Sequence, residues 1–288
     1  MSILFYLLSF LIALCGILAV ILYVEGCSDK ESFQTLHSQI PVFYINLDRS
    51  TDKQEKMENQ LKLHFNNFQR ISGVDGSKLH PNIYTNKINN NTSYNLKNFD
   101  GTIGRGNPSS VLGCLLSHIK TILLVDEKGY NNAVILEDDM DLQYYPKWNT
   151  TIENIINEAP DNWDIIKLFS LNQSKLKDDV NLLKKGIKYR KLPQNDIESE
   201  WSTGCYIINK RGVSKIMKDI QNNEFKIDKN EYKHLVADYY LYKNKNVYEY
   251  TKPLVAPFQN NKSDIENNGV NSADEKCATF VKNFYSSI

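Results

Sequence analysis

The stretch NNAVILEDDMD, residues 131–141, leads four apolar residues directly into three consecutive acids, with a fourth acid two places further on. Apolar runs of this length form buried strands, whereas adjacent carboxylates repel one another and resist burial. In an α/β sheet, ligands bind beyond the carboxyl ends of the strands. The stretch therefore predicts a strand that ends at a ligand site, with Glu137, Asp138 and Asp139 at its rim.

Glu137, Asp138 and Asp139 are candidate metal ligands. A divalent cation would neutralise their repulsion, and hard carboxylate oxygens suit Mn²⁺ or Mg²⁺. On extended backbone, Glu137 and Asp139 are expected to share one face, with Asp138 on the other. A solvated acidic turn that binds nothing is the alternative. The stretch is not an EF-hand, because the glycine that such a loop requires is missing.

Strands and helices are expected to alternate around this stretch, which predicts a single α/β domain with a Rossmann-type sandwich. The polar segments 77–107 and 172–200 are expected to be irregular, the second with one hairpin. Ser109 or Ser110 is expected to cap the longest helix, and Gly129 to end it. Strands are predicted at 41–47, 68–76, 133–137, 163–169, 204–210 and 246–250. Helices are predicted at 50–65, 109–129, 149–158, 211–220 and 236–244.

Residues 1–24 are the expected membrane anchor. The run ILFYLLSFLIALCGILAVILYV, residues 3–24, carries no charge and is long enough to cross about 30 Å of hydrocarbon. An uncleaved anchor is favoured over a signal peptide, whose apolar region is normally shorter, but the following VEGCS leaves cleavage open. A stalk over 25–39 and a catalytic domain over 40–288 complete the expected organisation.

The composition argues against nucleic acid as a ligand, and the cysteine spacing argues against a metal site built from cysteines. The chain has 34 Lys and Arg against 34 Asp and Glu, whereas a protein that binds nucleic-acid phosphates normally carries a basic excess. Nucleic acid is therefore not an expected partner. The five cysteines follow no metal-ligand spacing, and disulfides and isolated buried thiols both stay open for them.

A second candidate site follows the first predicted strand. YINLDRSTDK places Asn46, Asp48 and Arg49 where that strand ends. Polar and charged groups at this position could bind a nucleotide base, a ribose or a phosphate. The alternative is a helix cap with a surface ion pair.

The chain resembles glycosyltransferase family 25 over roughly residues 41–265. The resemblance rests on the order and spacing of INLDRSTDK, FQRISGVDG, GCLLSH, VILEDD, TGCYIINKRG, ADYYL and PLVAPFQNNKSDI. The family includes lipopolysaccharide-type galactosyltransferases and collagen hydroxylysine galactosyltransferases. The resemblance implies a GT-A fold, which is a Rossmann-like domain that binds a nucleotide sugar, usually UDP-linked, with Mn²⁺ (or Mg²⁺) at an acidic motif.

The resemblance also implies roles for the acids. Asp139 is the expected metal ligand, and Glu137 or Asp138 would hold the ribose or a metal-bound water. The family is classed as inverting, so a carboxylate must take the proton of the acceptor hydroxyl. Asp238, in LVADYYLY, matches a family acidic position and is the candidate base, with a helix-cap role as the alternative.

Other positions of the resemblance carry less specific expectations. His118 lies on an apolar helix face, which favours a structural histidine, although its match to the family also places it near the donor. Gln259 and Ser263, in FQNNKSDI, are expected to contact donor or acceptor. Lys53 stands where the family often has a second Arg; it keeps the charge but loses the planar fork of guanidinium.

The expected function is therefore a metal-dependent inverting transfer of galactose or glucose from a UDP-sugar donor to a hydroxyl. The acceptor would be a glycan or a hydroxylysine of a collagen-like protein, reached by a membrane-anchored domain on the lumenal side. One alternative is an inactive family member that binds glycans or proteins. The presence of the acids at 137–139 and of Asp238 argues against it, because an inactive protein is free to lose them. Another is a metal-dependent phosphohydrolase or nucleotidyltransferase, which leaves INLDRS and FQNNKSDI unexplained.

Overall fold

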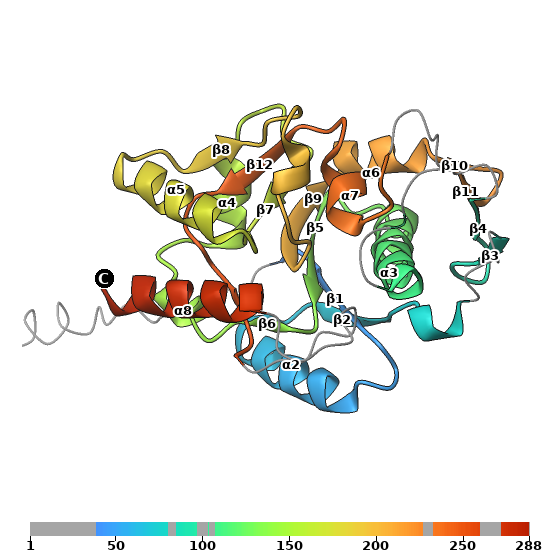
Figure 1. Cartoon of the computed structure of the whole chain (residues 1–288), viewed down its shortest axis with the longest axis horizontal. Helices are drawn as coiled ribbons and strands as arrows, with labels where there is room; N and C mark the ends of the chain where they lie inside the picture. Colours follow the sequence, from blue (N-terminus) through green and yellow to red (C-terminus); the bar gives the residue numbers. More distant parts are fainter. Residues whose placement is uncertain are drawn as a thin grey trace, which may run out of the picture. The chain divides into compact units, whose positions relative to one another are not determined.

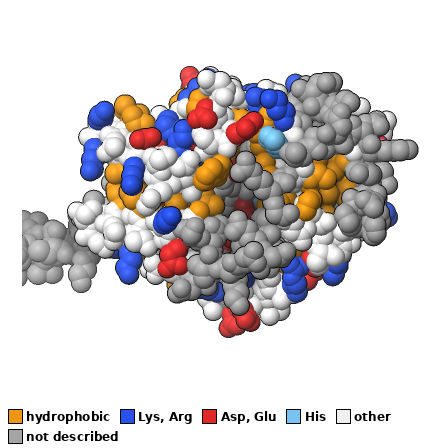
Figure 2. All heavy atoms as spheres, in the orientation of Figure 1, with side chains coloured by type: hydrophobic (Ala, Val, Ile, Leu, Met, Phe, Trp, Pro, Cys, Tyr) orange, Lys and Arg blue, Asp and Glu red, His pale blue; other side chains and the backbone are white. Residues whose placement is uncertain are grey.

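The computed structural model describes residues 39–79, 85–96, 103, 107–226, 233–259 and 272–287. The predicted anchor, the stalk up to residue 38 and Ser263 lie outside the described residues. On the face drawn in Figure 2, acidic and basic side chains are interspersed over the described surface.

A seven-stranded mixed sheet organises the domain (Figure 1), with the strand order β2-β1-β5-β9-β7-β12-β8. Strand β1 runs parallel to β2 and β5, and β7 runs parallel to β12, but β9 runs antiparallel between β5 and β7. The sheet is therefore mixed, unlike an all-parallel Rossmann sheet. Its strands are β1 (Val42–Asn46), β2 (Phe68–Ser72), β5 (Asn132–Glu137), β7 (Ile165–Lys167), β8 (Tyr189–Lys191), β9 (Cys205–Asn209) and β12 (Val247–Tyr250).

Both faces of the sheet are covered, which explains why its central strands are continuous apolar runs. Phe43 and Ile45 of β1 pack into one core, whereas Val42 and Tyr44 pack into a second core on the other face. Helices α3 (Pro108–Glu127), α6 (Lys210–Met217) and α7 (Ala237–Tyr242) contribute to the first core. Helices α2 (Thr51–His64), α4 (Ile152–Asn157), α5 (Gln173–Lys184) and α8 (Ser272–Ser286) contribute to the second.

Helix α3 begins at Pro108, one residue before the predicted start at 109. Asn107, and neither Ser109 nor Ser110, is its cap: the Asn107 side chain accepts a hydrogen bond from the backbone N–H of Ser109, and Pro108 occupies the first turn. Gly129 ends the helix as predicted, with φ of 67°. Among the described residues, α3 is the one helix with the length and composition of a membrane span, and 61% of its apolar window is buried, as in a core helix.

The two segments predicted to be irregular contain regular structure. Segment 172–200 was expected to hold one hairpin, which is wrong: it forms α5 and β8, because Asn172 caps a helix whose Leu176 and Val180 are buried. Segment 77–107 contributes two strands to a second, four-stranded sheet. The remaining strands are β3 (Thr85–Lys87), β4 (Ser93–Asn95), β10 (Ile220–Gln221) and β11 (Glu224–Lys226) in that sheet, and β6 (Met140–Asp141) paired with β13 (Ala256–Pro257). Short 3-10 helices lie at Gly76–Lys78, Tyr145–Lys147 and Ile197–Ser199.

The strand order reverses between β1 and β5. From β1 the chain passes through α2 on one face to β2, and then through α3 on the other face to β5, on the opposite side of β1. Adjacent parallel strands whose connections leave on opposite faces open a crevice at their carboxyl ends. Asn46 ends β1 and Glu137 ends β5, and Ile45 is aligned with Glu137. The fold thus brings the two predicted clusters to one crevice.

Candidate functional site

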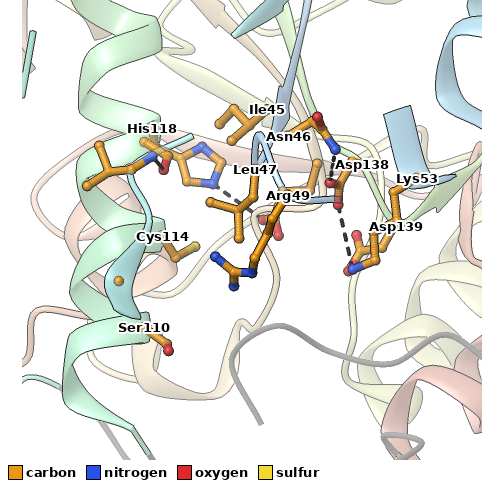
Figure 3. Close-up of a pocket in the computed structure, with 14 residues that line it drawn as sticks. Ile45, Asn46, Leu47, Arg49, Lys53, Ser110, Cys114, His118, Asp138 and Asp139 are labelled. Atoms are coloured by element: carbon orange, nitrogen blue, oxygen red, sulfur yellow. Dashed lines mark hydrogen bonds and ion pairs between the residues drawn. The ribbon is translucent and has the colours of Figure 1, made fainter. Parts of the chain in front are cut away.

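A pocket with a cavity volume of about 90 Å³ lies beyond the carboxyl ends of β1 and β5 (Figure 3). This volume has room for several water-sized groups. Four segments line it: the end of β1 with the start of α2, the loop at Val74 and Gly76, the first half of α3, and the end of β5 with the two acids that follow it. Figure 3 shows Cys114 and His118 on the α3 side of the pocket, with Lys53 on the side of Asp138 and Asp139.

All three acids of the 137–139 segment line this pocket. The prediction that Asp138 would face away from Glu137 and Asp139 is wrong. Strand β5 ends at Glu137, and the next two residues form a turn, so the alternation of an extended chain stops before Asp138. The turn directs three carboxylates into one space.

Asn46 holds Asp138 in place. The Nδ2 of Asn46 donates to Asp138 Oδ2 at 2.7 Å and to the carbonyl of Ser50 at 2.9 Å, while its Oδ1 accepts from Arg70 Nε at 2.8 Å. Lys53 Nζ lies 3.9 Å from the other Asp138 oxygen. Asn46 is 1% exposed, so this side chain is a buried connection between the ends of β1 and β5.

Asp139 is the acid of segment 137–139 with an unsatisfied carboxylate oxygen. Its Oδ1 is buried and has no hydrogen-bond partner, although its backbone carbonyl accepts from Phe258 N at 2.9 Å. Burial and the charges of Glu137 and Asp138 hold the pKa of Asp139 well above its usual range. A buried carboxylate oxygen without a donor fits a cation ligand, because a cation would supply the missing partner.

Glu137 has the opposite environment. Its Oε1 accepts from Thr203 Oγ1 at 2.6 Å and lies 3.3 Å from His118 Nε2, while His118 Nδ1 lies 3.0 Å from the hydroxyl of Tyr206. Burial alone would raise the pKa of Glu137, but the hydrogen bonds with His118 and Thr203 outweigh burial and lower it. His118 is fully buried, so it is both a structural histidine and a neighbour of the pocket.

One further set of side chains has metal-ligand geometry. Among the described residues, Cys114, His118 and Glu137 are the one group of three whose possible ligand atoms all lie within 4.8 Å of one another. Cys114 was not predicted as a site residue, because its partners come from the same helix four residues on and from a distant strand. The spacing Cys-x-x-x-His on a helix was the available signal, since residues four apart share a face.

Basic side chains line the same pocket. Arg49 Nη1 lies 2.5 Å from Asp75 Oδ1, and the Arg49 side chain is 45% exposed. Lys53, in the first turn of α2, reaches toward Asp138. Acids and bases therefore face one space, which suits a ligand that carries both a cation and anionic oxygens.

The wall formed by α3 depends on two glycines. A Cβ on Gly76 would lie 2.4 Å from the carbonyl oxygen of Ser109, and one on Gly113 would lie 2.7 Å from that of Val74. The loop and the helix are thus in backbone contact. A hydrogen bond also joins the loop to the helix, because Ser117 Oγ accepts from Val74 N at 2.8 Å.

Three predicted site residues do not line the pocket. Asp48 binds Arg70 Nη2 at 2.6 Å and accepts from Ser72 Oγ at 3.0 Å, at the open edge beside β2. Gln259 is exposed in a turn after β13. Asp238, at the start of α7, accepts from the backbone N–H of Ser202 at 3.3 Å.

Asp238 is nonetheless connected to the pocket. The segment whose Ser202 binds Asp238 continues into Thr203, which binds Glu137. Burial raises the pKa of Asp238, and the charge of Glu137 acts in the same direction. The long-range position of Thr203, 66 residues from Glu137 in the chain, explains why sequence reasoning missed it.

Comparison with known proteins identifies the family. The family described as "Glycosyltransferase family 25 (LPS biosynthesis protein)" matches residues 39–230, two-thirds of the chain. The chain belongs to glycosyltransferase family 25. Every residue that lines the pocket lies within the matched range of this family 25 chain, whereas Asp238 and Gln259 lie beyond it.

Two curated relatives carry names that bear on the activity. Procollagen galactosyltransferase 1 of Danio rerio is 26% identical over 182 residues, which cover 62% of the family 25 chain and 28% of the relative. Procollagen galactosyltransferase 1-B of Xenopus laevis is 26% identical over 198 residues, which cover 65% and 30%. The matched part thus spans about three-tenths of the length of each relative.

Proposed function

We propose that this family 25 chain is a metal-dependent inverting glycosyltransferase that moves a hexose, galactose or glucose, from a UDP-sugar to an acceptor hydroxyl. The observation that carries the proposal is the unpartnered buried Oδ1 of Asp139, in a pocket that Arg49 and Lys53 also line. An orphaned carboxylate oxygen among acids suits a hard divalent cation, and basic side chains suit a diphosphate. The mixed sheet with its crevice at β1 and β5 supports a GT-A type of nucleotide-sugar domain.

The residues of the pocket would divide the work as follows. Mn²⁺ or Mg²⁺ held at Asp139 would supply Lewis-acid stabilisation for the negative charge on departing UDP. Asp138 and Glu137, each fixed by hydrogen bonds, would hold the ribose or a water on the cation. Arg49 and Lys53 would bind the diphosphate oxygens and offset the remaining negative charge.

We assign the base to Asp238. In an inverting transfer the acceptor oxygen attacks the anomeric carbon, the bond from that carbon to UDP breaks, and the base takes the hydroxyl proton. Burial raises the pKa of Asp238, which makes its carboxylate a stronger base. Its contact with Ser202 holds it beside the segment that reaches Glu137, so we expect the acceptor on the α7 side of the pocket.

The names of the relatives support galactose as the sugar and procollagen as the acceptor, while the family description supports a lipopolysaccharide-type glycan. Both acceptors offer the hydroxyl that the mechanism requires. An anchor over residues 1–24 would hold the domain at a membrane, on its lumenal side. Alkaline carbonate extraction of membranes would release the chain if residues 1–24 do not anchor it.

The decisive experiment is UDP release by the purified full-length chain with Mn²⁺ and a hydroxylysine peptide or glycan acceptor. UDP-galactose, UDP-glucose and UDP-N-acetylglucosamine are compared, with EDTA as the metal-free arm. We expect release with one donor, lost with EDTA, and reduced at least about a hundredfold by Asp139→Asn. Asp141→Asn is the matched control, because Asp141 lies two residues on and does not line the pocket.

Three outcomes would contradict the proposal. Metal-dependent turnover that survives Asp139→Asn would remove Asp139 from the metal site. Release of UDP at the same rate with and without acceptor would identify a hydrolase. A folded chain that binds UDP with no donor turned over would point to an inactive, ligand-binding member of the family.

A further inference from the structure

Cys114 and His118 present two different donor atoms from one face of α3. They are four residues apart on the helix, and their possible ligand atoms lie within 4.8 Å of each other and of a Glu137 oxygen. Cys114 is half-buried and lines the pocket, so a small ion can reach it from the cavity. The three ligands come from α3 and from the end of β5, two elements held together by the core.

Surrounding contacts already orient these ligands. The imidazole of His118 is fully buried, and the hydroxyl of Tyr206 lies 3.0 Å from its Nδ1, which leaves Nε2 directed at Glu137. Thr203 fixes the Glu137 carboxylate through a bond of 2.6 Å. Metal-binding histidines usually have their other ring nitrogen hydrogen-bonded in this way, because the contact sets the tautomer and the ring orientation.

The donor set selects a kind of metal. A thiolate, an imidazole and a carboxylate favour Zn²⁺, which binds three protein ligands and leaves a fourth position for water. Mn²⁺ and Mg²⁺ prefer oxygen ligands, which Asp139 offers on the other side of the pocket. The pocket therefore contains two neighbouring donor sets of different softness.

We propose that Cys114, His118 and Glu137 form an inhibitory site for Zn²⁺, distinct from the Mn²⁺ site proposed at Asp139. On binding, the Cys114 sulfur exchanges its proton for the metal, and the proton is released to solvent. Glu137 becomes a zinc ligand and is withdrawn from the donor. The inhibition rests on the proposed transferase function, whereas the binding of the ion does not.

Cobalt(II) replaces zinc as the spectroscopic probe, because thiolate coordination to Co²⁺ gives an intense near-ultraviolet absorption band. The purified full-length chain is titrated with CoCl₂ and then with ZnCl₂. We expect a band that saturates at one equivalent, disappears on addition of Zn²⁺, and is absent in Cys114→Ser. Cys277→Ser is the matched control and keeps the band, because Cys277 is buried elsewhere, against the carbonyl of Leu171.

Alkylation of the unmodified chain tests the site without any variant. Zn²⁺, but not Mn²⁺, is expected to protect Cys114 from N-ethylmaleimide, read by peptide mass spectrometry. In activity assays, Zn²⁺ is expected to inhibit in the presence of excess Mn²⁺, at a concentration at least about tenfold lower for the native chain than for Cys114→Ser.

The failures of the two proposals are distinguishable. A band that persists in Cys114→Ser, or Cys114 alkylated equally with and without Zn²⁺, overturns the zinc site whatever the transferase activity. A band that behaves as expected in a chain that turns over no UDP-sugar leaves the zinc site standing and overturns the transferase function. Zinc binding with unchanged turnover overturns the inhibitory role.

Discussion

Three neighbouring acids in the pocket lie in different environments because each has different contacts. Hydrogen bonds lower the pKa of Glu137, whereas burial and adjacent negative charge raise that of Asp139. Asp138 is paired with Asn46 and lies near Lys53. A run of like residues in the sequence is thus divided by its contacts: Glu137 and Asp138 accept hydrogen bonds, whereas Asp139 Oδ1 has no hydrogen-bond partner.

Thr203 is expected to act by positioning Glu137. Thr203→Val keeps the shape of the side chain but removes the donor 2.6 Å from Glu137 Oε1. A hydrogen bond to a charged group contributes about 1.5–3 kcal/mol, so we expect kcat/KM for the proposed UDP-sugar donor to fall about tenfold or more. Thr203→Ser, which restores the hydroxyl, is expected to recover most of the rate. Equal kinetics for the valine and serine variants would show that this contact has no role.

At the scale of elements, the pocket wall depends on how closely α3 approaches the loop that follows β2. The approach is possible because neither Gly76 nor Gly113 has a Cβ. The close contact brings Val74 N to the hydroxyl of Ser117, and it places Cys114 and His118 of the same helix beside Glu137.

Gly113→Ala tests this packing. Helix propensity alone would stabilise the variant by about 1 kcal/mol. The added Cβ, however, would lie 2.7 Å from the carbonyl oxygen of Val74, which is backbone and cannot rotate away. Overpacking costs about 1–3 kcal/mol, so we expect a lower free energy of unfolding in urea denaturation. Glu127→Ala, at an exposed position of the same helix, is the control; a Gly113→Ala chain more stable than the native one would contradict the packing argument.

At the scale of the whole molecule, a buried cluster of charges joins β7, β12, β8 and α5. Lys167 and Glu249 lie 3.0 Å apart and are both almost fully buried, and Arg190 binds Asp179 and Glu200 beside them. Lys167 also donates to the carbonyl of Trp201 at 3.2 Å. The cluster thereby connects the far half of the sheet to the segment that carries Thr203.

The stability of the domain is expected to depend on Glu249. Burial raises the pKa of Glu249 from 4.5 to about 7, against the attraction of Lys167. A pKa that is higher in the folded than in the unfolded state gives stability that is fully present below pH 4.5 and is lost as the pH rises through about 7. We expect the free energy of unfolding, measured in urea from pH 5 to pH 8, to decrease across this range.

Glu249→Gln is expected to reduce that pH dependence, because the amide does not titrate. Glu275→Gln, an exposed substitution on α8, is the control and keeps the native slope. If the native chain and Glu249→Gln had the same slope, another group would be responsible.

Much of the site was predictable from local sequence. Asn46, Arg49 and the three acids of segment 137–139 line the pocket, as expected from an apolar strand followed by polar groups. His118 also lines it, as its match to family 25 implied. Two strands with this pattern, at 41–47 and 133–137, are enough to indicate a crevice at their ends. The order and spacing of the quoted blocks also indicated family 25, because that order is a property of the chain itself.

What the sequence by itself determined is what acts within a few residues: the buried strands, the caps, the helical faces and the acids at the end of β5. The tertiary structure alone decided that Thr203 contacts Glu137 and that Cys114 lies beside the same carboxylate. It also decided that Asp48 binds Arg70 and does not line the pocket. It also inserted β9 antiparallel into the middle of the sheet. The physical reason is that these contacts depend on strand order and helix approach, which bring together side chains separated by many residues and are not encoded in any single local pattern.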